Sequence, residues 1–552
     1  MLIRPIDFAV ILLYLAGITA FGARFRKSQH TIRDYFLGGR TAPWWALACS
    51  IVATETSTLT IIGTPAIAYG GNLGFLQLVL GYLVARVILC LVLVPQYFQG
   101  EFYTAYQLLE KRFGVRMKSA AATVFLGTRA LAEGVRIAAI GKVVSVAFGT
   151  GVRSSIAIVA VLTMFYTFEG GMRAVIWTDV IQFFLYIAGS LAAFFLLLHK
   201  IPGGWPEVTQ AAAAAGGKLR VFDFAFSLTQ SYTFWSGLIG GTFLTMASHG
   251  TDQTMVQRLL AARNEGDAKK ALLGSGVVIF AQFALFLVLG VMLFVFALHA
   301  PLPIPGGDTD RIFPEFVVRY MPAGVAGLVL ASMFAVAMSN ASGALNSLAS
   351  SSVIDLGIGK GMGGVKVIEL GVDMGAGGGR IGRNLGSGLG DRSGRLGQSR
   401  LITLVWGVVL GLLGMVNWGP VLQAGLTIAS ITYGGMLGVF LLGTWNRRAN
   451  ETGALVGFVA GIITMIAVRF ETPLAFTWYT FAGTLVTFAV GSLVSLVAGD
   501  TPKTTPRRTS DSNRRRSPVA TASLFRRAPC LPQMQATASV TGASGKSSGW
   551  RR

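Results

Sequence analysis

Apolar runs of about the length of a membrane-spanning helix recur through most of the sequence. A bilayer core requires about 20 consecutive apolar residues, and thirteen such runs are centred near residues 15, 55, 85, 135, 160, 188, 243, 285, 335, 408, 433, 461 and 486. The runs near 160 and 408 are the shortest. Charged residues make up only 13% of the chain, whereas soluble domains contain roughly 25%. The pattern predicts an all-α polytopic membrane protein with about thirteen transmembrane helices.

The formal net charge of +22 is distributed as expected for a membrane topology. When the loops are assigned alternately to two sides, one side carries 23 lysines and arginines and the other carries 8. Cytoplasmic loops are enriched in Lys and Arg. We therefore expect a multi-pass protein of the cell inner (plasma) membrane, with its N-terminus outside and its C-terminus in the cytoplasm. The lipid bilayer is the expected partner, and no nucleic acid is predicted.

The sequence lacks the motifs of enzymes and of ATP-driven pumps. Its four histidines are scattered, its three cysteines form no cluster with metal-ligand spacing, and the phosphate-binding pattern GxxxxGK[ST] does not occur. No kinase-like segment follows residue 496, which argues against a membrane sensor. Only Arg4 precedes the first apolar run, so we expect a retained helix and not a cleaved signal peptide. We expect neither enzymatic activity nor an obligatory protein partner.

One run combines apolar residues with polar ones at membrane depth. It reads SIVATETSTLTIIGTP, with Glu55 at its centre and Gly63 and Pro65 near its end. An ionisable residue at the centre of a span costs roughly 2.5 to 3.5 kcal/mol on insertion scales, and broken backbone is tolerated there only where it lines a cavity. The run therefore predicts a discontinuous helix whose oxygens bind an alkali cation. The alternative is that Glu55 pairs with an arginine elsewhere in the bundle.

Three further stretches carry polar residues inside apolar runs. The run ASMFAVAMSNASGALNSLASSSVIDL contains Asn340 among small and hydroxylated residues, which also suit close helix packing. Asp179 lies about a turn inside its run and is either a functional carboxylate or a helix cap. His249 adjoins Gly250, where a second helix break is expected, and is otherwise an ordinary buried histidine.

One helix carries a charged stripe that we interpret as structural. Arg129, Glu133 and Arg136 lie at positions i, i+4 and i+7, so their side chains share one helix face and can neutralise each other.

Four motifs together resemble the sodium:solute symporter family. They are DYFLGGR, EGGMRAVIWTDVIQ, GTDQTMVQRLLAA and MSNASGALNSLASSSVIDL, in this order along the chain. The resemblance covers roughly residues 5–356 and, more weakly, 400–496. It implies a secondary transporter with a five-plus-five inverted repeat, broken helices 1 and 6, one leading helix and two trailing helices.

This resemblance implies a domain organisation with two repeats. Residues 1–42 form the leading helix and a cytoplasmic loop, 43–199 the first repeat, 200–233 an extracellular loop, 234–444 the second repeat and 445–500 the trailing helices. The Gly/Arg-rich segment 357–400 matches nothing in the family, and 501–552 reads as a basic, disordered cytoplasmic tail. Three interpretations of these two segments are open: a flexible connector and tail, basic segments that contact lipid headgroups, or sequence translated out of frame. The sequence does not distinguish the first from the third.

The resemblance also implies a sodium site between core helices 1 and 8. Matched position by position, its ligands are the following: Ala53, Thr56, Val336, Ser339 and Asn340. The family usually has a second Ser or Thr where this chain has Asn340, but an amide oxygen is still a hard ligand.

Some family members have a second cation site. Here its aspartate corresponds to Asp179 and one hydroxyl to Ser342, whereas the other hydroxyl position is Gly343. We therefore expect a single coupling ion, Na+, with Asp179 and Ser342 as a possible second cation or proton site.

The solute-facing positions carry over more loosely from the family. They are the following: Glu55, Thr60, Thr245, Ser248 and His249. Glu55 stands where a proline-transporting relative has an aspartate, and the family's sugar carriers have uncharged side chains there. We therefore expect an amino acid or a similar solute rather than a sugar, with an amine favoured and an anion disfavoured beside an ionised Glu55.

The sequence predicts a sodium-coupled symporter that imports a small organic solute by alternating access. A proton-coupled symporter of the same fold, with Glu55 or Asp179 as the proton carrier, is the alternative, and Asn340 in a sodium position favours it. A sodium-dependence measurement separates the two.

Overall fold

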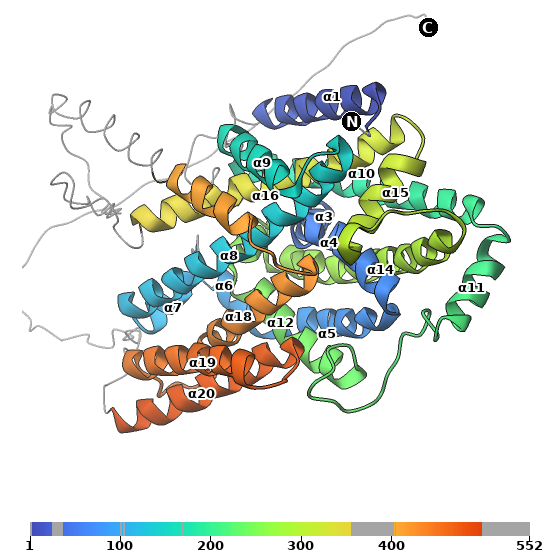
Figure 1. The fold of residues 1–552 in the computed structure, drawn as a ribbon. Coiled ribbons are helices and arrows are strands. Elements are labelled where there is room, and N and C mark those ends of the chain that lie inside the picture. Colours follow the sequence, from blue (N-terminus) through green and yellow to red (C-terminus); the bar gives the residue numbers. More distant parts are fainter. Residues whose placement is uncertain are drawn as a thin grey trace, which may run out of the picture. The chain divides into compact units, whose positions relative to one another are not determined.

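The computed structural model describes residues 3–24, 37–99, 102, 105–166, 171–354, 402 and 404–498. Every regular element in these ranges is a helix, and one isolated bridge joins Ala42 to Ala262 (Figure 1). The two segments with unusual composition, 357–400 and 501–552, lie outside the described residues.

The described helices form two groups along the chain. The first group is α1 (Pro5–Ala23), α3 (Trp44–Glu55), α4 (Thr58–Gly70), α5 (Leu76–Val92), α6 (Val94–Phe98), α7 (Tyr106–Arg112), α8 (Val115–Phe148), α9 (Val152–Tyr166) and α10 (Gly171–Lys200). The second group is α11 (Gly204–Ala214), α12 (Phe234–Gly250), α13 (Gln253–Leu260), α14 (Glu265–His299), α15 (Ile312–Tyr320), α16 (Val325–Ile354), α18 (Val421–Trp445), α19 (Glu451–Glu471) and α20 (Tyr479–Val497).

Many of these helices are long and apolar enough to cross a membrane. In the described part of the chain six helices meet this criterion, and eight do if each of two bent pairs counts as one span. Three shorter apolar helices are Pro5–Phe21, Val325–Met338 and Leu404–Gly414. Each of the thirteen predicted runs coincides with a helix. The helices fit a polytopic membrane protein, and the count of thirteen spans stays a prediction.

The expected discontinuity lies between α3 and α4, whose axes differ by 65°. Thr56 and Ser57 have extended backbone, with φ/ψ of −85°/97° and −99°/176°. The amide of Thr56 closes α3 on the carbonyl of Val52, and the carbonyl of Ser57 accepts the first bonds of α4. The carbonyls after Val52 in the last turn of α3 have no amide partner one turn further on, as at any helix end, and the carbonyl of Glu55 accepts a hydrogen bond from the Thr60 hydroxyl (3.4 Å). Polar backbone is therefore freed at this break.

A second break separates α12 from α13. The amide of Thr251 bonds to the carbonyl of Ala247 and ends α12. Asp252 then caps α13, because its Oδ1 accepts a hydrogen bond of 2.8 Å from the amide of Thr254. The break follows Gly250, as predicted.

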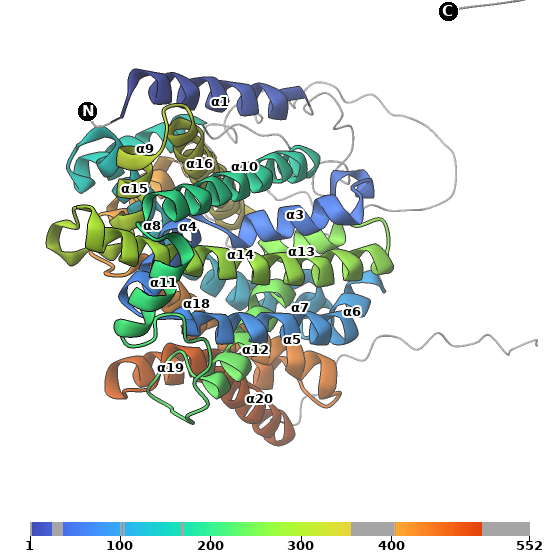
Figure 2. The same cartoon turned by 90° about the vertical axis from the view of Figure 1, so that its right-hand side faces the viewer.

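Glycine faces allow the helices of the bundle to approach closely. Gly237 and Gly241 of α12 face the backbone of α5, and Gly290 of α14 faces the backbone of α4 near Pro65. Small residues at such contacts are typical of membrane helix packing, since lipid gives no hydrophobic drive for association. The two views show α14 beside α3 and α4 (Figures 1 and 2). Close packing against α14 and α5 thus fixes the halves of both broken helices.

The leading helix α1 packs against α16 through a buried carboxylate. Asp7 is 2% exposed. Its Oδ1 accepts hydrogen bonds from the amides of Gly324 (2.6 Å) and Gly327 (2.9 Å), at the start of α16. A carboxylate at this end of a helix satisfies free N–H groups and complements the helix dipole. Asp7 therefore fixes the N-terminal end of α16 from a different helix.

We predict that Asp7→Ala lowers stability, because it leaves two buried amides without an acceptor, at a cost of about 1 to 3 kcal/mol. Asp7→Asn keeps a side-chain oxygen and is the matched control, with a smaller expected loss. The measurement is the thermal unfolding midpoint of the purified protein in detergent. Equal midpoints for the wild type and Asp7→Ala would show that the contact contributes nothing.

Candidate functional site

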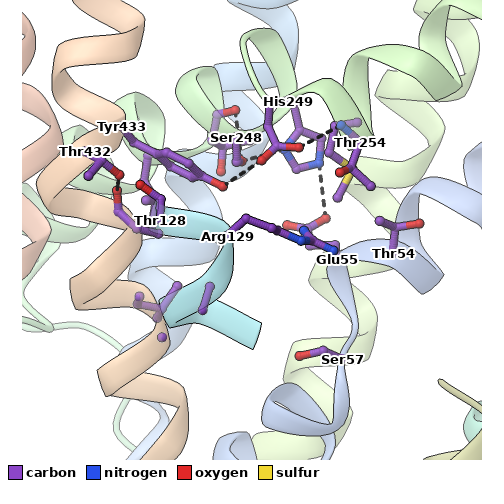
Figure 3. A pocket seen from close by; sticks show the side chains of 18 of the residues that line it. Thr54, Glu55, Ser57, Thr128, Arg129, Ser248, His249, Thr254, Thr432 and Tyr433 are labelled. Carbon is purple, nitrogen blue, oxygen red and sulfur yellow. Dashed lines mark hydrogen bonds and ion pairs between the residues drawn. The ribbon is translucent and has the colours of Figure 1, made fainter. Parts of the chain in front are cut away.

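A cavity of about 180 Å³ lies where the two helix breaks meet (Figure 3). Its walls come from the α3/α4 break, from α8, from the α12/α13 break, and from single positions on α14 and α16 together with several on α18. Its polar lining includes Thr54, Glu55, Ser57, Thr60, Thr128, Arg129, Arg136, Thr245, Ser248, His249, Thr251, Asp252, Thr254, Asn340, Thr432 and Tyr433. Two discontinuous helices thus present backbone and side-chain polar groups to one cavity.

The structure brings all five predicted solute-facing residues into this cavity. They are Glu55, Thr60, Thr245, Ser248 and His249. Among the predicted sodium ligands, Asn340 also lines the cavity, whereas Ala53, Thr56 and Val336 are buried beside it. The side chains of Ser339 and Ser342 lie outside the described part of the structure. Their assigned roles are not tested by this geometry.

Glu55 is paired with an arginine, the alternative that the sequence left open. Arg86 of α5 places Nη2 2.5 Å from Glu55 Oε2, and the two side chains are 1% and 12% exposed. The remaining donors of Arg86 bond to the Ser275 hydroxyl (3.3 Å) and to the Tyr82 carbonyl (3.1 Å). Because a buried charge needs both a counter-ion and hydrogen bonds, Arg86 explains how α3 ends in a carboxylate at membrane depth.

His249 completes this cluster from the other broken helix. Its Nε2 lies 3.2 Å from Arg86 Nη2, and its Nδ1 lies 2.8 Å from the Ser248 hydroxyl. Nε2 also lies 3.5 Å from Glu55 Oε2. A guanidinium only donates and a carboxylate only accepts, so Nε2 accepts from Arg86 when the ring proton is on Nδ1 and donates to Glu55 when Nε2 carries a proton. The last turns of both α3 and α12 are therefore joined through Arg86.

Asp179 also has an arginine partner. Arg258 of α13 places Nη2 3.0 Å from Asp179 Oδ2. The hydroxyl of Ser50 donates to the same carboxylate oxygen (2.6 Å) and accepts from Arg258 Nε (3.0 Å). These bonds tie α3, α10 and α13 together, and a protein cation already neutralises Asp179. A role for Asp179 in a second cation site stays a prediction.

The break at Thr56 is held by neutral polar contacts. Gln282 of α14 donates from Nε2 to the Thr56 hydroxyl (2.7 Å), and the hydroxyl of Tyr186 donates to the Gln282 amide oxygen (3.0 Å). At the start of α4, the Thr58 hydroxyl donates to the carbonyl of Met333 on α16 (3.4 Å). The helix with the predicted ligands Val336 and Asn340 therefore contacts the helix break directly.

The charged stripe of α8, which the sequence analysis took as structural, faces the cavity. Glu133 is fully buried and lies 2.8 Å from Arg136 Nη1 but 3.7 Å from Arg129 Nη2. The Nε atoms of both arginines are buried and, among the described residues, have no hydrogen-bond partner. Arg129 reaches into the cavity across from Glu55 (Figure 3). The i, i+4, i+7 spacing predicted that the three side chains share one face of α8, but it could not predict that this face lines the cavity.

A second cavity, of about 320 Å³, lies beyond Leu422, which lines both cavities. Next to it, Lys142 of α8 contacts Asp308 (2.8 Å) and Asp310 (2.7 Å). Asp310 Oδ2 also accepts from the amide of Val421, the first residue of α18 (3.1 Å). This ion-pair cluster holds the start of α18, and with it Leu422, between the two cavities.

We predict that Arg86→Gln destabilises the protein by about 3 kcal/mol or more, because it leaves Glu55 as an unpaired buried charge. The double variant Glu55→Gln with Arg86→Gln should recover most of this loss, since neither charge remains. Thermal unfolding of the wild type, Glu55→Gln, Arg86→Gln and the double variant measures the coupling. If the losses of the two single variants simply add in the double variant, the pair does not interact.

Comparisons with known proteins agree with this geometry. The profile of the sodium:solute symporter family matches residues 35–358. The sodium/sialic acid symporter NanT of Aliivibrio fischeri is 31% identical over 89% of this chain and 93% of its own length. The sodium/sialic acid symporter SiaT of Proteus mirabilis is 29% identical over 89% and 95%. The human sodium/iodide cotransporter is 28% identical over 82% and 68%.

A solved structure shows the same fold. It is a Na+-coupled sialic acid symporter in a substrate-bound, outward-open state, with a TM-score of 0.74, 28% identity, and coverage of 90% of this chain and 99% of that chain. These relatives are sodium-coupled transporters and not enzymes. They confirm two predictions from the sequence, that Na+ is the coupling ion and that the protein is not an enzyme. The chain belongs to the sodium:solute symporter family.

Proposed function

We propose that this protein is a sodium-coupled symporter of a small carboxylate-bearing solute of the sialic acid class. The observation that carries the proposal is the cavity at the two helix breaks, which contains an incompletely paired arginine, Arg129. Two relatives similar over 89% of the chain are sodium/sialic acid symporters. Sialic acids are acidic sugars, so their carboxylate suits a guanidinium and their hydroxyls suit the Thr and Ser lining.

This proposal reverses the sequence-based preference for an amine over an anion. That preference assumed an ionised Glu55 facing the solute alone, whereas Arg86 neutralises it. The named relatives carry sialic acid, iodide and monocarboxylates, so an amino acid in preference to a sugar is not supported. Arg129 is the cavity cation with the weakest ion pair. It is therefore our candidate for the solute carboxylate, opposite Thr60, Thr245 and Ser248.

For the coupling ion we propose one sodium site at the α3/α4 break. The proposed ligands are Ala53 and Thr56 from the break, with Val336, Ser339 and Asn340 from α16. Freed carbonyls at a helix break are hard oxygen ligands for an alkali cation. The contact between Thr58 and Met333 brings α16 to this break, which supports the proposal.

Proton coupling through Glu55 or Asp179 is less well supported. Each carboxylate is bound to a buried arginine. It would have to leave this ion pair to take up a proton, at the cost of an unpaired guanidinium. For the same reason we propose a single coupling ion, with no second site at Asp179 and Ser342.

We further propose thirteen spans arranged as two inverted repeats, 43–199 and 234–444, with the N-terminus outside and the C-terminus in the cytoplasm. In this orientation the main cavity, whose lining includes Tyr106 of α7 and Val124 of α8, would open toward the side of the basic loops. Leu422 and the Lys142 cluster would then close the outer side. Such an arrangement is one half of an alternating-access cycle, in which sodium and solute bind together at the midplane.

Uptake of labelled N-acetylneuraminate into proteoliposomes tests the function. We expect uptake with an inward sodium gradient and none with potassium at the same concentration, because sodium completes the site that closes over the solute. Uptake that follows a proton gradient and ignores sodium would overturn the sodium site. Sodium-driven uptake of an amine in place of the carboxylate would overturn the solute class.

Arg129→Gln is predicted to weaken carboxylate binding by about 10-fold or more, since one charge-assisted hydrogen-bonded pair is lost. Arg220→Gln, at a 61% exposed side chain of an outer loop, is the control and should leave binding unchanged. The measurement is the half-saturating solute concentration at saturating sodium. An unchanged value for Arg129→Gln would remove this arginine from the solute site.

A further inference from the structure

Asn340 has an unusual hydrogen-bonding state. It lies on α16, lines the main cavity, and its Nδ2 atom is buried without a hydrogen-bond partner. Among the described residues it is the one side-chain amide nitrogen in this condition. Buried donors in native proteins nearly always have a partner. The donor of Asn340 is therefore available to a group that enters the cavity.

The two ends of an amide do different chemistry. The oxygen accepts hydrogen bonds or ligates a hard cation, whereas the nitrogen only donates. A Ser or Thr, which the family resemblance places at this position, has a single hydroxyl atom for both tasks. Asn340 can address two partners at once, because its oxygen and nitrogen point in different directions.

Asn340 lies on the helix that contacts the α3/α4 break, because Met333, seven residues earlier on α16, accepts a hydrogen bond from Thr58 at the start of α4. Asn340 also lines the cavity, together with Thr60, Ser248 and Arg129. A partner for Nδ2 must therefore be an acceptor that arrives in the cavity.

We propose that Asn340 contacts the ion and the solute together: Oδ1 ligates sodium, and Nδ2 donates a hydrogen bond to an oxygen of the solute. The inference rests on the proposed function and deepens it. Rotation about the terminal bond of an Asn side chain has a broad, shallow profile, so a free amide has no fixed direction. Sodium at Oδ1 sets this direction and aims Nδ2 at the solute. The residue thereby transmits sodium binding to solute affinity, and it selects solutes with an acceptor oxygen at this place.

Two substitutions separate the roles of the two amide ends. Asn340→Asp is isosteric and keeps an oxygen for sodium but loses the donor, and it adds a charge that repels an anionic solute. Asn340→Thr keeps a hydroxyl oxygen without that charge and is too short to reach both partners. Asn446→Thr is the matched control, because Asn446, the residue after α18, does not line the cavity and its Nδ2 already bonds to the Ser492 hydroxyl (3.0 Å).

The experiment measures two affinities of the full-length protein in detergent. Binding of ²²Na+ without solute reports the ion site, and binding of labelled N-acetylneuraminate with and without sodium reports the solute site and its coupling. We expect sodium affinity within about threefold of the wild type in Asn340→Thr. We expect solute affinity to fall about 10-fold in both Asn340 variants, the factor for one lost hydrogen bond to a buried group. The gain in solute affinity that sodium provides should shrink in parallel, because coupling is reciprocal.

The results distinguish this inference from the proposed function. If the wild type binds the solute in a sodium-dependent way, and Asn340→Thr has wild-type solute affinity and coupling, the double contact is wrong and the symporter proposal stands. Loss of sodium binding with unchanged sodium-independent solute binding would assign Asn340 to the ion alone and also overturn the inference. If the wild type itself shows no sodium-dependent binding, the proposed function fails first.

Discussion

The absence of water from the bilayer core is the constraint on which the structure depends. Backbone groups in hydrocarbon must be satisfied within the protein, yet two helices are interrupted beside one cavity. The interruptions are supported from outside by neutral contacts, such as Gln282 on Thr56, and by charged ones, such as Arg86 on Glu55. The neighbouring helices α5 and α14 thus supply the hydrogen bonds and the counter-ion that stabilise the interrupted helix ends. Other polar groups at these ends stay available to an ion and a solute.

Charges within the bundle are arranged in pairs that join separate helices. Arg86 connects the ends of α3 and α12, Arg258 connects α13 to α10, and Lys142 connects α8 to the loop before α15. Each pair replaces solvation by a specific partner, so it holds only while the helices keep their relative positions. A transporter that moves helix groups against each other must either carry these pairs along or break them.

Much of the fold was readable from the sequence, because each relevant signal is local. The apolar runs predicted the helices, and Glu55 among hydroxylated residues predicted the break between α3 and α4, whereas Gly63 and Pro65, also used in that prediction, lie inside α4. The partner of Glu55 was not predictable, since Arg86 lies on another helix and no local spacing connects the two. The same limit affected the expected solute: a lone Glu55 favours an amine, whereas pairing with Arg86 removes the reason for that preference.

Leu422 borders both cavities, so in places the wall between them is one side chain thick. A barrier this thin needs little displacement of α18 to change which cavity the midplane site faces. The seal between the two cavities also depends on how Leu422 packs against Gly63, because a Cβ atom at Gly63 would touch Leu422. A gap at this point would let water and ions pass without the solute. The contact between Leu422 and Gly63 is therefore one place where the wall must stay closed if an ion gradient is to drive transport.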